Sequence, residues 1–355
     1  MDPFQRRRIG RTALEVTQLG MGGASLGDMR ETISEAQAEA TLETAYAAGV
    51  GYFDTSPWYG HGKSELRFGH VLRTKPRGGF ALSTKVGRVY SRPDDPATFQ
   101  QRSWQGGLPF ALRFDYTHDG VLHSYEQSLM RLGLNRVDAL VIHDLDPRHQ
   151  KSEAGVVASL DQLDTGRGFR ALADLRARGE IAAVGAGINE IGMIPRFLER
   201  FDLDFFLVAM PYTLLDQEGL AELTMCAARG VSVVIGAPFA SGILARGAEA
   251  TDGPFATYRY MPATPDITIK TQRMHAVCKR HGVPLAAAAL QFPFGHPAVA
   301  AVIPGPVAAE EVRRNVAWMR HAIPVRLWAE LQAEGLLHPD APAPEGVPAR
   351  LDKAP

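Results

Sequence analysis

The hydrophobic positions of the chain fall into short apolar runs that alternate with amphipathic stretches. The runs are continuous rather than alternating in polarity, which is typical of parallel strands covered on both faces. The stretches between them repeat apolar residues at helical spacing, as in 35–48, where Ala38, Leu42 and Ala45 share one face. Eight strands are expected, centred near residues 19, 53, 82, 140, 183, 207, 233 and 301.

Eight strand–helix units without a break in composition predict one α/β domain, a (β/α)8 TIM barrel, over residues 1–337. An N-terminal β-hairpin at 6–16, turning at Gly10-Arg11, should cap the barrel. Long loops at 86–117 and 236–266 should lie at its C-terminal face, and 144–168 reads as a polar loop. The expected helices are 35–48, 64–73 with Ser64 as N-cap, 119–132, 169–178, 190–198, 218–229, 268–281, 285–292, 309–318 and 325–334. The Pro- and Ala-rich tail, 338–355, is expected to be loosely ordered.

Composition excludes several classes of protein. The chain has 45% hydrophobic residues, enough for a large core. Its formal net charge is −1, so no overall electrostatic field attracts nucleic acid or an anionic membrane. No run approaches the roughly 20 apolar residues of a membrane span, and no apolar stretch follows the basic N-terminus as a signal peptide requires. The two cysteines, Cys226 and Cys278, lie in helical patterns and suit structural thiols. We therefore expect a cytoplasmic protein.

Polar residues end three consecutive strands, where a barrel of this kind carries its chemistry. The second strand ends in Asp54, the third in Lys85 and the fourth in His143, while Tyr59 follows the second strand in a loop. A tyrosine near pKa 10 is a poor acid or base at neutral pH, but an adjacent ammonium lowers that pKa. Asp54 would hold the ammonium in place, and a neutral His143 would hydrogen-bond a substrate oxygen. Each residue alone is more often structural, but the four together predict proton transfer coupled to hydride transfer.

The chain resembles the aldo-keto reductase superfamily over roughly residues 6–320. The resemblance is carried by Phe53-Asp-Thr-Ser-Pro-Trp-Tyr-Gly60 with Ser64-Glu65, Ser83-Thr-Lys-Val-Gly87, Val141-Ile-His143, and Val302-Ile-Pro-Gly305 with Asn315. It implies a catalytic tetrad of Asp54, Tyr59, Lys85 and His143, and a nicotinamide cofactor across the barrel mouth without a Rossmann motif. Three further segments are similar to the branch of D-threo-aldose (L-fucose) 1-dehydrogenases and pyridoxal 4-dehydrogenase. These are Gly187-Ile-Asn-Glu190, Pro211-Tyr-Thr-Leu-Leu-Asp-Gln217 and Pro238-Phe-Ala-Ser-Gly-Ile-Leu244.

The resemblance also implies where the cofactor and the substrate bind. The implied cofactor-binding residues are Gly22, Gly23, Asp54, Asn189, Pro238, Phe239, Ser241, Gly242, Leu244, Gly305, Val307, Glu311, Arg314 and Asn315. The implied substrate-binding residues are Trp58, Tyr59, His143 and Trp104. Gly236 stands where the family often stacks a tyrosine on the nicotinamide. Members that prefer NADP place Lys, Ser and Arg around the 2′-phosphate, where this chain has Gly305, Pro306 and Glu311. A phosphate would find no cation there and one repulsive charge, so NAD is expected over NADP.

The function that the resemblance implies is oxidation of the anomeric hydroxyl of an aldose to a lactone by hydride transfer to NAD. L-fucose, D-arabinose and L-galactose are the type of sugar expected. The alternatives are a pyridoxal 4-dehydrogenase, a general aldehyde or ketone reductase, and, outside enzymes, a cofactor-binding regulatory module. The expected partner is a small sugar or aldehyde, with no nucleic acid or membrane, and the chain is expected to be a monomer or small homo-oligomer.

Two competing motifs carry less weight. Gly23-Ala-Ser-Leu-Gly27 matches the nucleophile elbow of hydrolases, but no strands precede it to build the required sheet. Gly185-Ala-Gly187 follows a strand but lacks the third glycine of a dinucleotide fingerprint, since Glu190 replaces it. The sequence holds no Cys/His set at zinc spacing, so no metal is expected.

Overall fold

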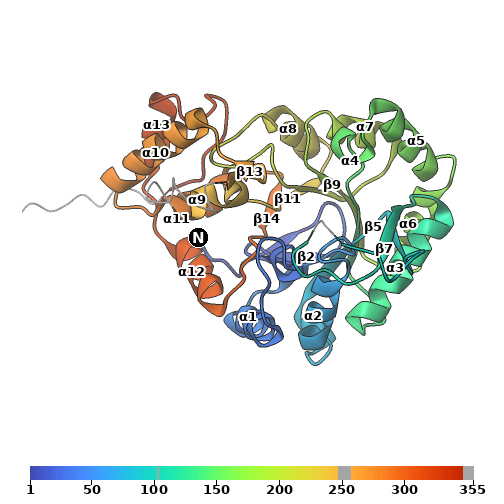
Figure 1. Cartoon of the computed structure of the whole chain (residues 1–355). Helices are drawn as coiled ribbons and strands as arrows, with labels where there is room; N and C mark the ends of the chain where they lie inside the picture. The colour runs from blue at the N-terminus through green and yellow to red at the C-terminus, as the bar shows by residue number, and fades with distance from the viewer. Residues whose placement is uncertain (102–103, 247–256, 347–355) are drawn as a thin grey trace, which may run out of the picture.

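Eight parallel strands form one sheet that curls into a barrel, and helices surround it (Figure 1). The structure is a computed structural model and describes residues 1–101, 104–246 and 257–346. In sheet order the strands are β3 (Met21–Gly22), β4 (Tyr52–Asp54), β5 (Ala81–Val86), β8 (Ala139–Ile142), β9 (Ala183–Ile188), β10 (Phe205–Val208), β11 (Ser232–Ile235) and β14 (Val299–Val302). A parallel bridge between Leu19 and Val302, with Gly20 N donating to Val302 O at 2.9 Å, joins the two ends of the sheet. The predicted (β/α)8 barrel is confirmed, and seven of the eight strands contain their expected centres. The first strand lies at Met21–Gly22, after its expected centre near residue 19.

The helices follow the strands in the expected alternation. The longer ones are α1 (Glu35–Ala48), α2 (Lys63–Leu72), α3 (His118–Leu132), α5 (Glu153–Leu163), α6 (Gly168–Ala177), α7 (Met193–Arg200), α8 (Leu220–Ala228), α10 (Pro265–Arg280), α11 (Leu285–Gln291), α12 (Ala309–Arg320) and α13 (Val325–Ala333). Helices α1 and α12 pack against each other where the first and last units meet. None of the helices in the described ranges is long and apolar enough to cross a membrane.

The hydrophobic core has two layers. The larger one lies between the strands and the surrounding helices. The smaller one fills the barrel interior and includes Tyr52, Val141, Phe205 and Leu207. Phe205 fits there because β9 offers Gly185 beside it, where a Cβ atom would come within 2.7 Å of the Phe205 ring.

The N-terminal hairpin closes one end of the barrel. Strand β1 (Arg6–Arg8) pairs antiparallel with β2 (Glu15–Thr17), and Gly10 takes a positive φ of 54° at the turn. Ile9 and Val16 are buried in the interior cluster. The hairpin cap is therefore confirmed, and the C-terminal ends of the strands are left as the mouth.

The segment 144–168 is not a polar loop, as the sequence suggested. It contains the short helix α4 (Pro147–Gln150) and the eleven-residue helix α5. Val156, Leu160 and Leu163 recur at helical spacing and are buried. Ser152 caps the helix, since its side chain accepts from Gly155 N at 3.0 Å. The polar outer face of α5 concealed this narrow apolar stripe.

The two long loops also contain regular structure. Within 86–117, β6 (Arg88–Ser91) pairs antiparallel with β7 (Ala111–Phe114). Within 236–266 lie a 3-10 turn at 240–242, the short helix α9 (Ile243–Arg246), and a hairpin of β12 (Thr257–Tyr258) and β13 (Met261–Pro262). The rest of this second loop, 247–256, lies outside the described residues. Strands this short leave too little alternation to be recognised in the sequence.

Three smaller expectations can be compared with the structure. Ser64 is not the N-cap of α2, because Gly62 takes that position and Ser64 Oγ donates to Gly23 O at 2.8 Å inside the barrel rim. Cys226 and Cys278 are buried free thiols, and burial raises the pKa of both to about 12. Of the expected loose tail, Ala341 is buried and its carbonyl accepts from Gln332 Nε2 at 3.2 Å, while residues 347–355 lie outside the described residues.

Candidate active site

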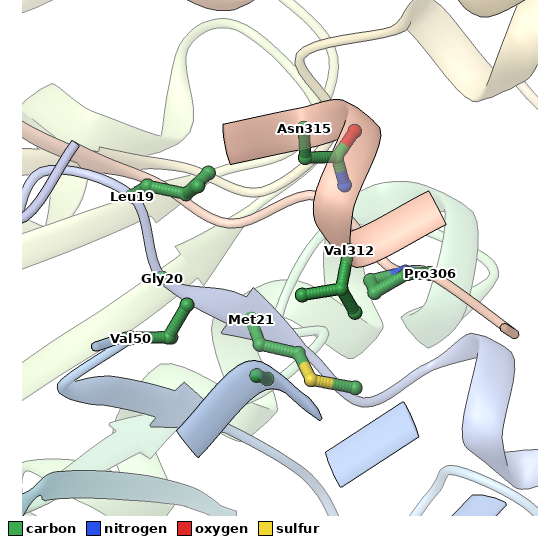
Figure 2. Close-up of a pocket in the computed structure, with 8 residues that line it drawn as sticks. Leu19, Gly20, Met21, Val50, Pro306, Val312 and Asn315 are labelled. Carbon is green, nitrogen blue, oxygen red and sulfur yellow. The ribbon is translucent and has the colours of Figure 1, made fainter. Parts of the chain in front are cut away.

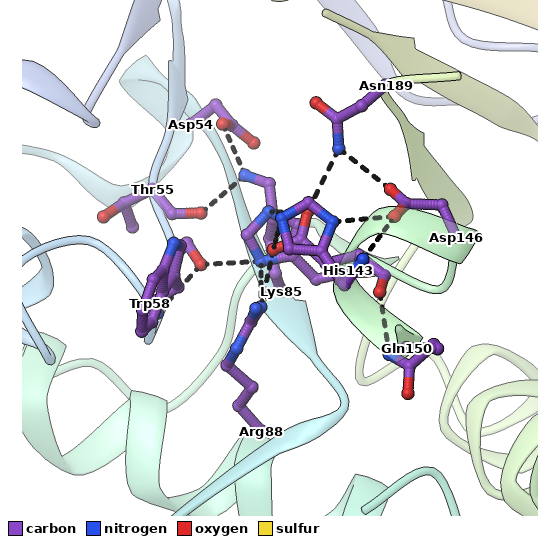
Figure 3. Close-up of polar contacts among 12 residues, drawn as sticks. Asp54, Thr55, Trp58, Lys85, Arg88, His143, Asp146, Gln150 and Asn189 are labelled. Carbon is purple, nitrogen blue, oxygen red and sulfur yellow. Dashed lines mark hydrogen bonds and ion pairs between the residues drawn. The ribbon is translucent and has the colours of Figure 1, made fainter. Parts of the chain in front are cut away.

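A buried ion pair lies at the ends of β4 and β5. Lys85 Nζ is 2.6 Å from Asp54 Oδ2 and donates to Thr55 O at 2.8 Å, and both side chains of the pair are at most 2% exposed (Figure 3). Ser83 donates to the other oxygen, Asp54 Oδ1, at 2.6 Å. Burial raises the pKa of Asp54, whereas the Lys85 ammonium and the Ser83 hydroxyl oppose that rise. The register of β4 on β5 therefore places a fixed cation at the mouth.

The loop after β4 brings Tyr59 to this cation. Gly60 takes a positive φ of 64° against Gly27, where a Cβ would lie 2.6 Å from Gly27 O, so the turn after Tyr59 requires glycine. The Lys85 ammonium lies 5.0 Å from the centre of the Tyr59 ring. The strand ends and this loop therefore bring the expected residues together.

The pKa of Tyr59 differs from the expected direction. Tyr59 is partly exposed as a residue, yet desolvation of its phenolate at the mouth raises its pKa well above 10. Asp54, Tyr260 and Asp144 raise it further, and Arg88 lowers it. The expectation that a neighbouring ammonium leaves Tyr59 with a lowered pKa is therefore wrong in the protein alone, because desolvation of the phenolate outweighs it.

His143 faces Tyr59 across the mouth. Their rings meet edge to face with centres 5.9 Å apart, and His143 is 8% exposed. Burial lowers the pKa of His143 well below 6.5, and although Asp144 opposes this, Arg88 and Lys85 add to it. The expected neutral imidazole is therefore the form that this environment favours.

Aromatic side chains line one side of this group. Trp58 and Trp104 meet edge to face at 5.7 Å, and Trp104 lies 5.8 Å from the Tyr59 ring. Trp104 is only 7% exposed, and its indole N–H finds no acceptor among the described residues. The two tryptophans expected to bind substrate thus adjoin Tyr59, and one offers an unpaired donor.

Sequence reasoning missed a charged cluster behind His143. Arg88 pairs with Asp144 at 2.8 Å, and Asn189 Nδ2 donates to Asp144 Oδ1 at 3.2 Å and to Asp146 Oδ2 at 3.3 Å (Figure 3). His149 Nδ1 lies 2.8 Å from Asp146 Oδ1. Asp144, Asp146 and His149 lie close enough together to hold a cation. Arg88, Asn189 and His149 already donate to the two carboxylates, so we interpret the cluster as a hydrogen-bond network rather than a metal site. The sequence did contain one indication of this cluster, because Arg88 and Asp144 each come two residues after the end of a barrel strand.

A second missed residue is Tyr260. It lies at the turn of the β12–β13 hairpin with a φ of 63°, and its backbone N–H donates to Ser241 Oγ at 3.0 Å. Its phenol is near enough to Tyr59 to raise the pKa of that residue. Nothing in its local sequence indicates this approach, because the hairpin that carries it was not recognised.

The residues implied to hold the cofactor are only partly brought together with this group. Asn189 is part of the cluster just described, and its Oδ1 makes no hydrogen bond to the described residues. The backbone N–H groups of Gly22 and Gly23 are used within the barrel, donating to Pro304 O at 2.9 Å and to Asp54 O at 2.8 Å. Leu244 is completely buried in the core, where its side chain packs against the protein.

The other residues of the loop 238–244, which follows β11, lie beside the mouth of the barrel. Ser241 O accepts from Thr257 Oγ1 at 2.7 Å, and Phe239 packs edge to face on Trp318 with ring centres 5.8 Å apart. Pro238 precedes the 3-10 turn, and Gly242 ends it with a φ of 123°.

The positions after β14 lie beside strand β3. Asn315 is buried and lines a small cavity with Leu19, Met21, Pro306 and Val312 (Figure 2). Gly305 is close-packed, because a Cβ there would lie 2.8 Å from Ser25 Oγ.

Helix α12 presents charges of both signs near this cavity. Glu311 Oε2 accepts from Val307 N at 2.8 Å. Arg313 and Arg314 are exposed, and each lies near a glutamate of the same helix, Glu310 at 3.3 Å and Glu311 at 3.8 Å respectively.

This barrel and this strand-end group match a known family. Residues 18–333 match the Aldo/keto reductase family, so the chain belongs to it. Members of this family are oxidoreductases that use nicotinamide cofactors.

Particular relatives narrow the comparison. The chain is 40% identical over 349 residues to "Pyridoxal 4-dehydrogenase" of Microbacterium luteolum, covering 94% of this chain and 98% of that protein. It is 37% identical over 330 residues to "D-threo-aldose 1-dehydrogenase" of a Pseudomonas species, covering 92% and 96%. An aldo-keto reductase of Bacillus halodurans in its holo form superposes with a TM-score of 0.71 at 23% identity, covering 96% of this chain and 98% of that one. That structural likeness supports the fold, and the two sequence relatives match the branch that the motifs indicated.

Proposed function

We propose that this protein oxidises the hydroxyl of a cyclic hemiacetal, first of all the anomeric hydroxyl of an aldose, to a lactone with NAD as the hydride acceptor. The observation that carries the proposal is the buried Lys85–Asp54 pair beside Tyr59, with a neutral His143 opposite. These groups come from three neighbouring strand ends and surround one point at the mouth. Such a constellation suits an alcohol proton that must leave as a hydride departs from the same carbon.

The proposed reaction balances as the loss of two hydrogens from one C–OH group. The hydroxyl proton passes to Tyr59 as a C=O bond forms, and a bound nicotinamide cofactor would take up the hydride from the anomeric carbon. Lys85, held by Asp54, stabilises the phenolate of Tyr59 that accepts this proton. His143 donates a hydrogen bond to the reacting oxygen. Trp58 and Trp104 would pack against the ring of the substrate.

The donor set at the mouth fits a nicotinamide cofactor. Asn189 Oδ1 is unpaired toward the described residues and suits the amide N–H of a carboxamide. Gly236 carries no side chain, and a Cβ there would lie 2.7 Å from Leu207, so this position cannot stack an aromatic ring. Bound there, the cofactor would supply the hydride-accepting ring that the chain itself lacks.

The surroundings of Glu311 favour NAD over NADP. Neither Gly305 nor Pro306 offers a cation, and Arg313 and Arg314 are exposed and near glutamates. A 2′-phosphate would meet the Glu311 carboxylate without a bidentate partner.

Replacing Glu311 should therefore change the cofactor preference. We expect turnover with NAD⁺ to exceed that with NADP⁺, and Glu311→Arg to improve relative use of NADP⁺ by about 10- to 100-fold, the equivalent of one charge-assisted hydrogen bond. Steady-state kinetics with both cofactors measures this. Glu310→Arg, which adds the same charge at a more exposed neighbouring position, is the matched control. A wild-type preference for NADP⁺ would contradict the assignment.

Pyridoxal is the second candidate substrate. Its aldehyde closes with the neighbouring hydroxymethyl group to a cyclic hemiacetal, so the same atoms react as in a pyranose. The similarity to "Pyridoxal 4-dehydrogenase" favours it, and so does the aromatic wall of Trp58 and Trp104.

A substrate panel tests the proposal directly. L-fucose, D-arabinose, L-galactose, pyridoxal and simple aldehydes would be offered with NAD⁺, and the aldehydes also with NADH, while NADH absorbance is followed. Lactone formation from a sugar or from pyridoxal is the expected result. Reduction of simple aldehydes without oxidation of any hemiacetal would instead show a general reductase.

A further inference from the structure

Arg88 is a buried cation that the catalytic scheme above does not use. The residue is only 6% exposed. Its guanidinium lies between two aromatic rings, 4.6 Å from the centre of Trp58 and 4.4 Å from that of Phe114. It pairs with Asp144 at 2.8 Å. Gly87 makes this placement possible, because its φ of 105° turns the chain between β5 and β6, and a Cβ there would lie 2.2 Å from Tyr116.

The guanidinium also contacts the imidazole of His143. Arg88 Nη1 lies 3.2 Å from His143 Nδ1 (Figure 3). A guanidinium has only donors, so Nδ1 must present its lone pair to it. Ser56 Oγ lies 3.1 Å from the same nitrogen and accepts from Trp58 N at 3.0 Å, which leaves its own proton to donate to Nδ1. Two donors therefore converge on one ring nitrogen.

The two donors differ in what they permit. A hydroxyl can reverse its role and accept a hydrogen bond from a protonated Nδ1, whereas a guanidinium cannot. Ser56 therefore tolerates an imidazolium, and Arg88 excludes it. A neutral ring with Nδ1 unprotonated carries its proton on Nε2, which lies 3.5 Å from Asp144 Oδ1, too far for a good hydrogen bond.

We propose that Arg88 is a positioning residue that keeps His143 neutral with its proton on Nε2, so that this N–H is the donor offered to the reacting oxygen. The inference rests on the proposed function, since it assigns how one of its residues is held ready. It also explains why an arginine is buried behind the site rather than paired at the surface. Lysine could not fill the same planar space between two rings.

The charges around His143 set the sign of the expected effect. Asp144 follows it in the chain, Lys85 faces it from β5, Arg88 from β6 and His149 from α4, and the Tyr59 ring packs on it from the loop after β4. Asp144 favours the imidazolium, while Arg88, Lys85 and His149 oppose it. Removal of Arg88 leaves Asp144 less opposed and raises the pKa of His143. A raised pKa means that the imidazolium forms at higher pH. The imidazolium keeps its Nε2–H, but its positive charge opposes the departure of a hydride from the neighbouring carbon, so oxidation should be lost earlier as the pH falls.

An Arg88→Met variant tests this in two independent ways. In selectively ¹⁵N-histidine-labelled protein, with His143→Gln to assign the signal, wild-type Nδ1 should stay unprotonated through mildly acidic pH. In Arg88→Met it should gain a proton, with a rise in pKa of about 1 to 3 units, the range for one neighbouring charge. The acidic limb of kcat/KM for oxidation should move up by the same amount. Arg88→Lys keeps a positive charge and should bring the pKa of His143 part of the way back to the wild-type value. Arg113→Met removes a 61% exposed arginine on β7 and should change neither readout.

Each outcome decides the inference. If Arg88→Met keeps the wild-type protonation of His143, Arg88 has no such role, whatever the activity. If near-ultraviolet circular dichroism shows that Arg88→Met does not fold, Arg88→Gln replaces it. The uncharged amide of glutamine can accept a hydrogen bond from a protonated Nδ1, so the same rise in the pKa of His143 is expected. If no hemiacetal is oxidised by the wild type but the ¹⁵N signals respond as stated, the proposed function is wrong and the role of Arg88 stands.

Discussion

A Tyr59→Phe variant is expected to oxidise its substrate about 10²- to 10⁴-fold more slowly than the wild type while binding the cofactor normally. The change removes only the hydroxyl, so the ring keeps its contacts with Lys85, Trp104 and His143. The proton of the substrate alcohol then has no acceptor at the mouth. Steady-state turnover and a fluorescence titration with NADH measure the two properties separately.

The pH dependence of the wild type provides a second signature of Tyr59. Burial holds its pKa well above 10, so the phenol stays protonated at neutral pH and ionises only as the pH rises. Oxidation should therefore speed up with increasing pH in the alkaline range, and this rise should disappear in Tyr59→Phe. The control is Tyr125→Phe, which removes a hydroxyl from a buried tyrosine of α3 outside the mouth. Near-normal turnover in Tyr59→Phe would show that another group moves the proton.

The residues that sequence reasoning located correctly share one property, a fixed position relative to a strand. Asp54, Lys85 and His143 lie at or next to the ends of β4, β5 and β8, which are parallel and adjacent. In a barrel, that relation alone brings side chains to one rim. Tyr59 belongs to the tight loop after β4. The fold and the group of four polar residues could therefore be predicted from short apolar runs and from the polar residues at their C-terminal ends.

The features that could not be predicted depend on how loops return to the barrel. Arg88 reaches His143 only because Gly87 reverses the chain, and Tyr260 reaches the mouth through a hairpin of two-residue strands. The direction in which the pKa of Tyr59 shifts could not be predicted either, because it depends on a balance between burial and several charges. Sequence spacing identifies the neighbouring ammonium but does not measure how far the phenol is removed from water.

The ion pair beneath Tyr59 yields the largest expected change in stability. Lys85→Met should lower the free energy of unfolding by about 3–5 kcal/mol, because it leaves the Asp54 carboxylate buried without a partner. The loss should be greatest near pH 8 and smaller near pH 5. Without Lys85 the pKa of Asp54 rises further above its unfolded value, so protonation relieves the buried charge as the pH falls. Urea denaturation at the two pH values measures both the loss and its sign.

A double variant separates this structural role from the catalytic one. Asp54→Asn/Lys85→Met removes both charges and should regain most of the lost stability, since a neutral pair leaves no ion buried alone. It should not regain turnover, because no ammonium then lies beside Tyr59 to stabilise the phenolate. Arg11→Met is the control, because it breaks an ion pair with Asp202 whose side chains are 63% and 64% exposed and should cost at most about 1 kcal/mol. Wild-type stability of Lys85→Met at pH 8 would mean that Asp54 is not held as an anion. In that case Lys85 is fixed by Thr55 O instead, and the assignment of Asp54 to the tetrad would be wrong.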